Sequence, residues 1–320
     1  MTRSVSRLAP SPTGALHLGN ARTFLINWAL ARQNGWKLLM RVEDLDGPRV
    51  KAEASREAID ILAWLGIDFD GEPLVQSNDL EPYRNAMRQL STQRLIYACD
   101  LTRTQIEAAA SAPHTGEHEL RYPPEMRPTL SDGNIDPMQQ DFETETRNYR
   151  LIVPDEEFVI HDHIAGRVTL NPFNEIGDFV VWTKRGVPAY QLAVVVDDAR
   201  QGVTDVVRGD DLLPSAARQM LLYRAMGFDP PRWWHLPLVL GTDGRRLAKR
   251  HGDTRLSGYR NAGVAAERVL ALLARWSGVD MRPRETELSA RDFRDRFDVN
   301  RLSRLPVVFT EEDHRWLLRK

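Results

Sequence analysis

The chain has 320 residues, with 43 Lys and Arg against 45 Asp and Glu, so its formal net charge is −2. This length allows one large or two modest domains, and nucleic-acid binding would require a local basic patch rather than a field over the whole molecule. A single cysteine excludes an intrachain disulfide, and no apolar run reaches membrane-spanning length or resembles a signal-peptide core, so we expect a cytoplasmic protein with no membrane partner.

The N-terminal residues predict a strand, a loop and a helix. Residues 4–9 form the strand, and the prolines and Gly14 that follow force the chain to turn. From about Leu18 the apolar residues recur at helical spacing, and Asn34 and Gly35 end the helix. Because this helix begins directly after a strand, its first N–H groups and the positive end of its dipole can bind a phosphate at the sheet edge.

The start of this helix carries side chains suited to a triphosphate. His17 and Asn20 lie on the first turn and can donate hydrogen bonds to phosphate oxygens. Gly19 leaves room for a base or ribose to approach the backbone. Taken alone, the pattern favours an ordinary strand–turn–helix connection that happens to contain a histidine.

The middle of the chain divides by composition. Residues 1–97 continue with a strand over 37–43 and an amphipathic helix over 52–65 that ends at Gly66. Residues 98–189 are rich in proline, glycine and acids and then β-like over 158–160, 167–170 and 179–182, which predicts an insertion. Residues 190–262 return to an α/β pattern, with helices over 190–196 and 214–226 and a strand over 204–207. Residues 263–320 are mostly helical, including the apolar segment 265–276.

A basic stretch late in the chain makes a phosphate site more plausible. Six cations stand in sixteen residues against one acid: Arg245, Arg246, Lys249, Arg250, Arg255 and Arg260. A solvated charged face is the usual interpretation of such a run. However, mobile Lys and Arg side chains beside a phosphate site can also neutralise the charge that develops at an α-phosphate as pyrophosphate leaves.

Together, the two stretches resemble the nucleotide-binding motifs of class I aminoacyl-tRNA synthetases, with His17-Leu-Gly-Asn20 as the first and Arg246-Leu-Ala-Lys-Arg250 as the second. Residues 7–14, 41–46, 188–192, 196–198 and 202–209 resemble the glutamyl branch in the same order. The resemblance implies an α/β, Rossmann-like class I catalytic domain split between residues 1–97 and 190–262. An inserted α+β subdomain of the acceptor-binding type (98–189) and a helical C-terminal segment (263–320) complete the expected domains.

The resemblance also implies the chemistry. L-glutamate would be activated by ATP with Mg²⁺ to glutamyl-adenylate, with His17, Asn20 and Lys249 acting on the phosphates. The implied ATP-binding residues are Pro10, Ser11, Thr13, Gly14, His17, Gly19, Asn20, Leu238, Val239, Arg246 and Lys249, with Leu238 and Val239 offering backbone groups to adenine. The implied glutamate-binding residues are Arg7, Ala9, Ser11, Glu43, Tyr190 and Arg208. Two guanidiniums and one carboxylate suit the two carboxylates and the ammonium of glutamate, but the sequence leaves open which arginine binds which carboxylate.

The acceptor is inferred from the length of the chain. Glutamyl-tRNA synthetases continue into a helical anticodon-binding domain, whereas this chain stops at Lys320. It therefore resembles the shorter branch, the glutamyl-queuosine tRNA(Asp) synthetases, and we expect tRNA-independent activation followed by transfer to the queuosine base at the wobble position of tRNA(Asp). Val194 supports this, because glutamyl-tRNA synthetases tend to carry an asparagine there, one helical turn after Tyr190 and facing the same site.

One departure from that branch concerns metal. Its members often hold zinc through Cys-X-Cys followed by a tyrosine and a cysteine. Here Leu101 and Met126 stand where two of the thiolates would be, which leaves Cys99 and Tyr122. Because one thiolate and one phenol cannot complete a tetrahedral site, we expect no zinc.

Three alternatives remain open. The chain could charge the 3′ end of tRNA(Glu). It could be a non-catalytic paralogue that binds glutamate or tRNA, because Asn20, Arg246 and Ala248 depart from the commonest motif letters. It could also be a small-molecule nucleotidylyltransferase, which shares a loop of the His-X-Gly-His type, but that activity would not explain the segments around Tyr190 and Arg208.

Overall fold

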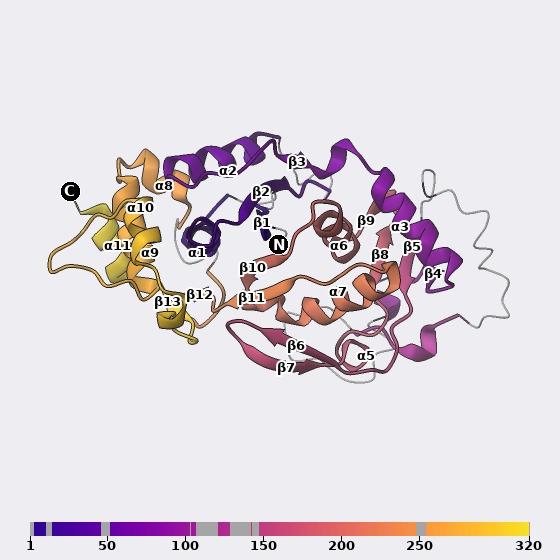
Figure 1. The fold of residues 1–320 in the computed structure, drawn as a ribbon. Helices are drawn as coiled ribbons and strands as arrows, with labels where there is room; N and C mark the ends of the chain where they lie inside the picture. Colours follow the sequence, from indigo (N-terminus) through magenta and orange to yellow (C-terminus); the bar gives the residue numbers. More distant parts are fainter. Residues whose placement is uncertain are drawn as a thin grey trace.

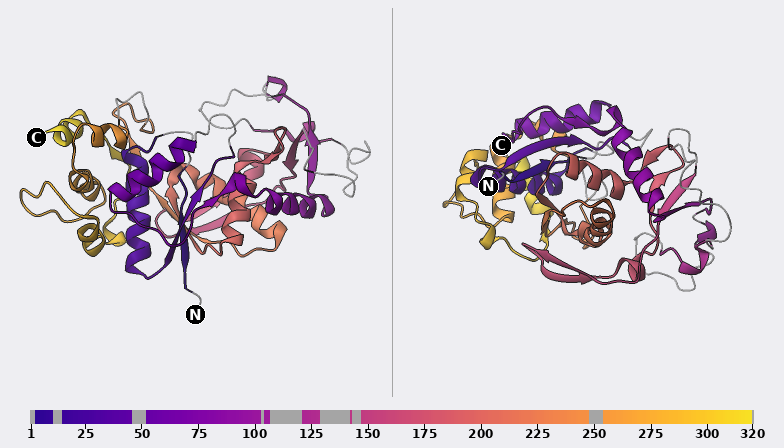
Figure 2. Two further views of the ribbon diagram at one scale, coloured as in Figure 1. Left: turned by 90° about the horizontal axis from the view of Figure 1, so that it is seen from above. Right: turned by 45° about the vertical axis from the view of Figure 1, so that its right-hand side comes forward.

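The computed structural model describes residues 3–10, 15–45, 52–102, 104–106, 121–128, 142, 147–247 and 254–319. The molecule is elongated, with two sheets of mainly parallel strands in the middle, the C-terminal helices at one end and an antiparallel sheet at the other (Figure 1). Two further views show the same order of parts (Figure 2). Within the described ranges, no helix combines the length and the apolar composition needed to cross a bilayer.

The two central sheets are built from apolar strands. The first sheet contains β1 (Val5–Leu8), β2 (Lys37–Val42) and β3 (Leu74–Val75), all parallel. The second contains, in this order, β10 (Asp205–Gly209), β11 (Arg232–Leu236), β6 (Phe158–Asp162) and β7 (Gly166–Leu170), and β7 alone runs antiparallel to its neighbour. Most residues of β1, β2 and β10 are buried, as expected for parallel strands covered on both faces.

The two sheets meet where β1 lies beside β10. The N–H of Thr204 donates to the carbonyl of Val5 at 2.9 Å, and the N–H of Val5 donates to Oγ1 of Thr204, also at 2.9 Å. Both strands therefore begin at the same edge, and their carboxyl ends lie together at the opposite edge, where parallel α/β sheets bind ligands.

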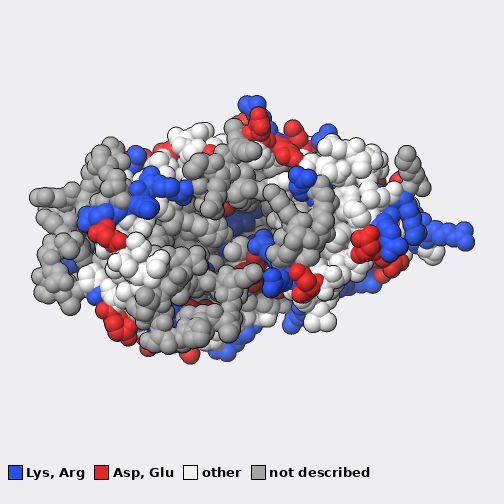
Figure 3. All heavy atoms as spheres, turned by 180° about the vertical axis from the view of Figure 1, so that it is seen from behind, with Lys and Arg blue, Asp and Glu red and all other residues white. Residues whose placement is uncertain are grey.

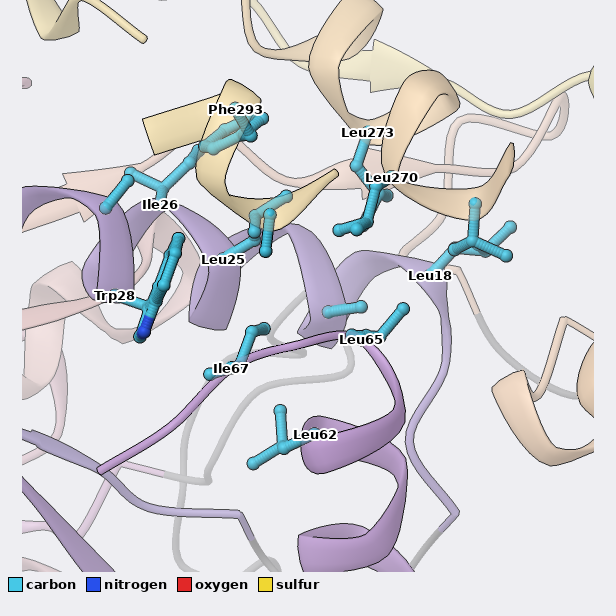
Figure 4. Packing of buried hydrophobic residues seen from close by; sticks show 14 of the residues in the cluster. Leu18, Leu25, Ile26, Trp28, Leu62, Leu65, Ile67, Leu270, Leu273 and Phe293 are labelled. Atoms are coloured by element: carbon cyan, nitrogen blue, oxygen red, sulfur yellow. The ribbon is translucent and has the colours of Figure 1, made fainter. Parts of the chain in front are cut away.

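Helix α1 (Leu18–Gln33) joins the central strands to the C-terminal helices. It contacts β1 and β10 on one side and α9 (Ala266–Trp276) and α10 (Ala290–Arg296) on the other. Apolar side chains of α1, α9, α10 and α2 (Ala52–Trp64) point toward one another between these helices (Figure 4). The same end of the molecule holds α8 (Leu256–Asn261), α11 (Glu311–Leu318) and the parallel pair of β12 (Val239–Leu240) with β13 (Val307–Val308).

The other end is an antiparallel sheet with its own core. Its strands lie in the order β4 (Ile96–Cys99), β5 (Asn148–Leu151), β8 (Val180–Thr183) and β9 (Val187–Pro188). Between this sheet and the central strands pack α3 (Glu81–Thr92), α6 (Tyr190–Arg200) and α7 (Leu213–Met226). Short helical turns complete the fold: α5 (Pro172–Glu175), η2 (Gln76–Asn78), η3 (Pro124–Met126), η5 (Asp210–Leu212) and η7 (Val299–Arg301).

The local sequence signals are confirmed where they were strongest. Helix α1 begins at Leu18, and α2 ends just before Gly66, which takes a positive φ of 75°. The strand predicted over 158–160 is longer and runs to Asp162. Buried and exposed residues alternate along this strand, which ends at the buried carboxylate of Asp162. The carboxylate is stabilised because it accepts hydrogen bonds from the backbone N–H groups of Ile164 and Ala165.

The core between α1 and the C-terminal helices yields a stability prediction. Phe293 is fully buried on α10 and stacks on Phe297 with ring centroids 5.3 Å apart. Phe293→Ala should therefore reduce the free energy of unfolding by about 3–5 kcal/mol in urea denaturation. Leu305→Ala is the control, because Leu305 is 73% exposed, and it should change stability by less than about 0.5 kcal/mol. Equal effects of the two changes would contradict this packing.

Candidate active site

A cavity of about 550 Å³ opens at the edge where β1 and β10 end and α1 begins. The space-filling view from behind shows a hollow near the middle of the molecule with basic and acidic atoms inside it (Figure 3). Of the residues that the resemblance implied, the following line the cavity together: Arg7, Ala9, Pro10, His17, Gly19, Asn20, Glu43, Tyr190, Arg208, Leu238, Val239 and Arg246. The remaining implied residues lie outside the described part of the chain: Ser11, Thr13, Gly14 and Lys249.

His17 is the N-cap of α1. Its Nδ1 accepts hydrogen bonds from the N–H groups of Gly19 at 3.1 Å and Asn20 at 3.4 Å, while Oδ1 of Asn20 accepts from the N–H of His17. Because Nδ1 is an acceptor, the proton of the neutral ring must lie on Nε2, which can then donate to a ligand. Burial, with a smaller contribution from Arg246, lowers the pKa of His17 to about 4, so the ring is neutral at pH 7.

Gly19 lies close to the ring of His17. A Cβ atom at residue 19 would lie 3.1 Å from both Cε1 and Nδ1 of the His17 ring. A side chain there would require the imidazole to shift by a few tenths of an ångström. This local reason for glycine adds to the expected space for a base or ribose.

Leu238 and Val239 form an apolar wall of the cavity. The carbonyl of Leu238 accepts from the N–H of Val307 at 2.9 Å, and the carbonyl of Val239 accepts from the N–H of Leu247 at 3.1 Å. Part of the backbone expected to face adenine is therefore already bonded within the protein. At the mouth of the cavity, Arg246 forms an ion pair with Asp211, a cavity-lining residue that the sequence did not single out.

A buried charge network forms the opposite end of the cavity. Oδ1 of Asp198 accepts from Nη1 of Arg41 at 2.7 Å and from Nε of Arg7 at 3.3 Å. Nε of Arg41 also donates to Glu43 at 3.2 Å. Burial alone would raise the pKa of Asp198, but Arg41 and Arg7 hold it below its usual value. Burial raises the pKa of Glu43, since the same two arginines offset only part of that effect.

Arg208 lies in the same end of the cavity, almost fully buried. Its Nε donates to Nε2 of His235 at 2.9 Å, its Nη1 to Gln219 at 3.0 Å and its Nη2 to the carbonyl of Leu212 at 3.1 Å. These bonds account for three of about five N–H groups of a guanidinium and leave two for a ligand. Sequence reasoning missed His235 and Gln219. Their contacts have no local signature, although Arg208 and His235 are direct partners in the register of β10 and β11.

The two residues expected to share a face of α6 differ in their exposure and in whether they line the cavity. Tyr190, its first residue, is 42% exposed and lines the cavity. Val194 is 1% exposed and is not among the described residues that line the cavity. The expectation that Val194 faces the site is therefore wrong, because α6 is buried on most of its surface after its first residue.

The segment compared with a zinc site is packed as an apolar cluster. Sγ of Cys99 lies 3.9 Å from the hydroxyl of Tyr122, which itself donates to the carbonyl of Met126 at 2.9 Å. Leu101 and Met126 pack against the same cluster. One sulfur among apolar groups does not match the donor set of zinc, and within the described ranges no group of three His, Cys, Asp or Glu side chains is arranged to hold a metal ion.

The cap by His17 predicts a pH dependence of stability. The folded-state pKa is about 4 against an ordinary value of 6.5, so the unfolded chain binds more protons and stability should fall as the pH drops from 6.5 towards 4. His17→Asn should lose less stability over this range, because asparagine also caps helices but does not titrate. Urea unfolding of both proteins at pH 7.5 and pH 4.5 measures the difference. Parallel losses in the two proteins would contradict a neutral, capping His17.

Comparisons with known proteins agree with this geometry. Residues 4–316 match the family model described as tRNA synthetases class I (E and Q), catalytic domain. The chain is 46% identical to the glutamyl-Q tRNA(Asp) synthetase of Rhodopirellula baltica, covering 96% of this chain and 97% of the relative. It is 44% identical to the protein of the same name from Symbiobacterium thermophilum, covering 96% of both.

A solved structure gives the same result for the fold. The crystal structure of glutamate-tRNA synthetase from Elizabethkingia anophelis matches with a TM-score of 0.77 and 26% identity, covering 99% of this chain and 70% of that one. The α/β class I catalytic fold expected from the sequence is thereby confirmed. The chain is a ligase that belongs to the class I tRNA synthetases for glutamate and glutamine, within the group of relatives called glutamyl-Q tRNA(Asp) synthetases.

Proposed function

We propose that this ligase activates L-glutamate with ATP in the absence of tRNA and transfers it to the queuosine base of tRNA(Asp). One observation carries the proposal: a single cavity is lined both by the capped N-terminus of α1 and by Arg7, Glu43 and Arg208. The first group suits a triphosphate, and the second suits an amino acid with two carboxylates. The names of the relatives support queuosine in tRNA(Asp) as the acceptor.

In this proposal, ATP binds at the start of α1. Nε2 of His17 carries a proton to donate, and the helix dipole favours the negative phosphates. Asn20 adds a side-chain amide on the same turn, and Leu238 and Val239 give an apolar surface for the base. Mg²⁺ enters as part of the substrate MgATP and takes mainly phosphate and water ligands. By resemblance, Lys249 and the remaining implied residues, which lie outside the described ranges, complete the site.

Glutamate binds at the charged end. The two uncommitted N–H groups of Arg208 can hold one carboxylate in a bidentate manner, Arg7 can hold the other, and Glu43 can accept from the ammonium. Arg41 and Asp198 balance the charges around Arg7 and Glu43 before substrate arrives. Glutamine should bind poorly, because its neutral amide would leave a buried guanidinium without a counter-charge.

The reaction needs no nucleophilic side chain. An oxygen of the glutamate α-carboxylate attacks the α-phosphorus of ATP, a carboxylate–phosphorus bond forms, and the bond to pyrophosphate breaks. A hydroxyl of queuosine's cyclopentene-diol then attacks the activated carbonyl, loses its proton and displaces AMP. The protein contributes positioning and stabilisation of charge. In this proposal, residues 1–97 and 190–262 form the split catalytic domain together with β6 and β7, because these two strands extend the second central sheet beside β11. The rest of residues 98–189 forms the insertion that meets the acceptor.

Activation can be tested without any tRNA. The protein should catalyse glutamate-dependent exchange between ATP and pyrophosphate, and glutamine and aspartate should be at least about a hundredfold poorer in kcat/KM, since they leave buried charges unpaired or out of reach. Isotope exchange with each amino acid measures this. A requirement for tRNA(Glu) would favour charging of a 3′ end, and no exchange under any condition would favour a binding paralogue.

The acceptor can be tested with matched tRNAs. With ATP and radiolabelled glutamate, tRNA(Asp) carrying queuosine should be labelled. The control is tRNA(Asp) from cells unable to make queuosine, because it keeps the same 3′ end and lacks only the diol nucleophile. Labelling of this control, or of tRNA(Glu), would rule out the queuosine base as the acceptor. Labelling should also weaken steeply with salt if basic side chains hold the tRNA phosphates.

A further inference from the structure

Three side chains from three adjacent strands form a hydrogen-bonded row behind the cavity wall. They are Arg208 of β10, His235 of β11 and Asp162 of β6. Nε of Arg208 donates to Nε2 of His235 at 2.9 Å, and Nδ1 of His235 lies 2.6 Å from Oδ2 of Asp162. The side chains of His235 and Asp162 are completely buried. Neither residue lines the cavity, so their effect on a ligand must pass through Arg208.

The partners fix the protonation of His235. Nε of an arginine can only donate, so Nε2 of His235 must be the acceptor and carry no proton. The single proton of the neutral ring is therefore on Nδ1 and is donated to Asp162. Burial and the positive charge of Arg208 lower the pKa of His235, and they outweigh the opposite effect of Asp162 and Asp211, so the ring is neutral.

Asp162 is itself held in one orientation. Its Oδ1 accepts from the N–H groups of Ile164 at 2.8 Å and Ala165 at 2.7 Å, and its Oδ2 accepts from the N–H of His235 at 3.1 Å. These backbone donors prevent the carboxylate from rotating. The imidazole of His235 is therefore oriented by the backbone of two strands and one turn, and not by a single flexible contact.

The row ends on the guanidinium that faces the cavity. Besides His235, Arg208 is held by Gln219 and by the carbonyl of Leu212, and its guanidinium lies 4.7 Å from the ring centroid of Trp233. The bond to His235 engages Nε, and so it sets the rotation of the guanidinium plane. That rotation decides where the two remaining N–H groups point.

The geometry points to His235, oriented by Asp162, as a positioning residue that aims the guanidinium of Arg208 at a carboxylate of the amino-acid substrate. This inference rests on the proposed function, because it takes Arg208 as a ligand for glutamate. Residues 158–170, which contain Asp162, lie in the range 98–189 that the sequence predicted as an insertion, but β6 pairs with β11 in the second central sheet. This strand therefore supports Arg208 from behind the cavity wall.

Asp162→Asn is the sharpest test. If the carbonyl of the new asparagine keeps the bonds to Ile164 and Ala165, its NH₂ group takes the place of Oδ2 and faces Nδ1 of His235. The backbone N–H of His235 then keeps only its contact with Oδ1, at 3.3 Å. His235 then has to carry its proton on Nε2, where it opposes Nε–H of Arg208. The exchange assay should show a KM for glutamate raised about 10- to 100-fold, the loss expected for a hydrogen bond to a charged group, with the KM for ATP within about twofold.

Asp205→Asn is the matched control. Asp205 is equally buried, begins the same strand as Arg208, and accepts from Nε1 of Trp234 at 3.1 Å and Nη2 of Arg232 at 2.7 Å. It should affect stability without a selective effect on the KM for glutamate. A second pair of variants tests the hydrogen-bond acceptor that residue 235 offers to Arg208. The side chain in His235→Gln can still accept from Arg208, so this variant should have a lower KM for glutamate than His235→Leu.

Nitrogen-15 NMR of the histidine rings separates this inference from the proposed function. The wild-type ring of His235 should be protonated on Nδ1, and that of Asp162→Asn on Nε2. A changed tautomer with an unchanged glutamate KM would overturn the positioning role, as would equal KM values for the Gln and Leu variants. If the wild-type protein shows no glutamate-dependent exchange, the proposed function fails. The NMR result would then still test the predicted hydrogen bonds of His235, because a wild-type ring protonated on Nε2 would contradict them.

Discussion

The sheet edge that carries the cavity depends on a buried ion pair between residues that are 157 positions apart in the chain. Nη1 of Arg41, from β2, donates to Asp198, from α6, at 2.7 Å, and both side chains are essentially inaccessible to solvent. A charge at this depth is tolerated only with a partner and further hydrogen bonds. Strand β2 and helix α6 therefore have to pack against each other before either charge can be buried.

The rest of the amino-acid end follows from this pair. Arg7 shares the carboxylate of Asp198, and Glu43 shares the guanidinium of Arg41. The groups that face the cavity are thus neutralised and oriented before a ligand enters, which lowers the cost of reorganisation on binding. At the other end of the cavity, a neutral histidine caps the N-terminus of α1, and the Arg246 side chain nearby is paired with Asp211. The two ends of the cavity therefore differ: one is built on a buried network of ionised side chains, and the other on a helix N-terminus.

Local signals made part of this structure predictable. The apolar spacing after residue 18 and the turn at Asn34 define α1, and Gly66 marks the end of α2. The motif residues could be assigned to one site because their segments resemble a family whose members share that arrangement. The role of His17 as a helix cap was not predicted, since a histidine at that place reads equally well as a phosphate ligand or as a chance residue.

Contacts between distant strands could not be predicted. His235 and Asp162 are 73 residues apart, and only the register of three strands brings them together behind Arg208. Val194 shows the opposite error: helical spacing placed it on the same face as Tyr190, but the packing of α6 buries it. Periodicity gives the face of an element, whereas the neighbours of that face are set by the tertiary fold.

The short strand pair β12–β13 has a consequence for where this enzyme can be divided. Leu238 and Val239 form a wall of the cavity, yet the carbonyls of Leu238 and Leu240 are bonded to the N–H groups of Val307 and Phe309, far along the chain. The C-terminal segment therefore supports, from outside, the cavity wall that Leu238 and Val239 form. A shortened enzyme that ended after α9 would keep every cavity-lining residue named above. It would still lose the backbone hydrogen bonds that support the surface formed by those residues.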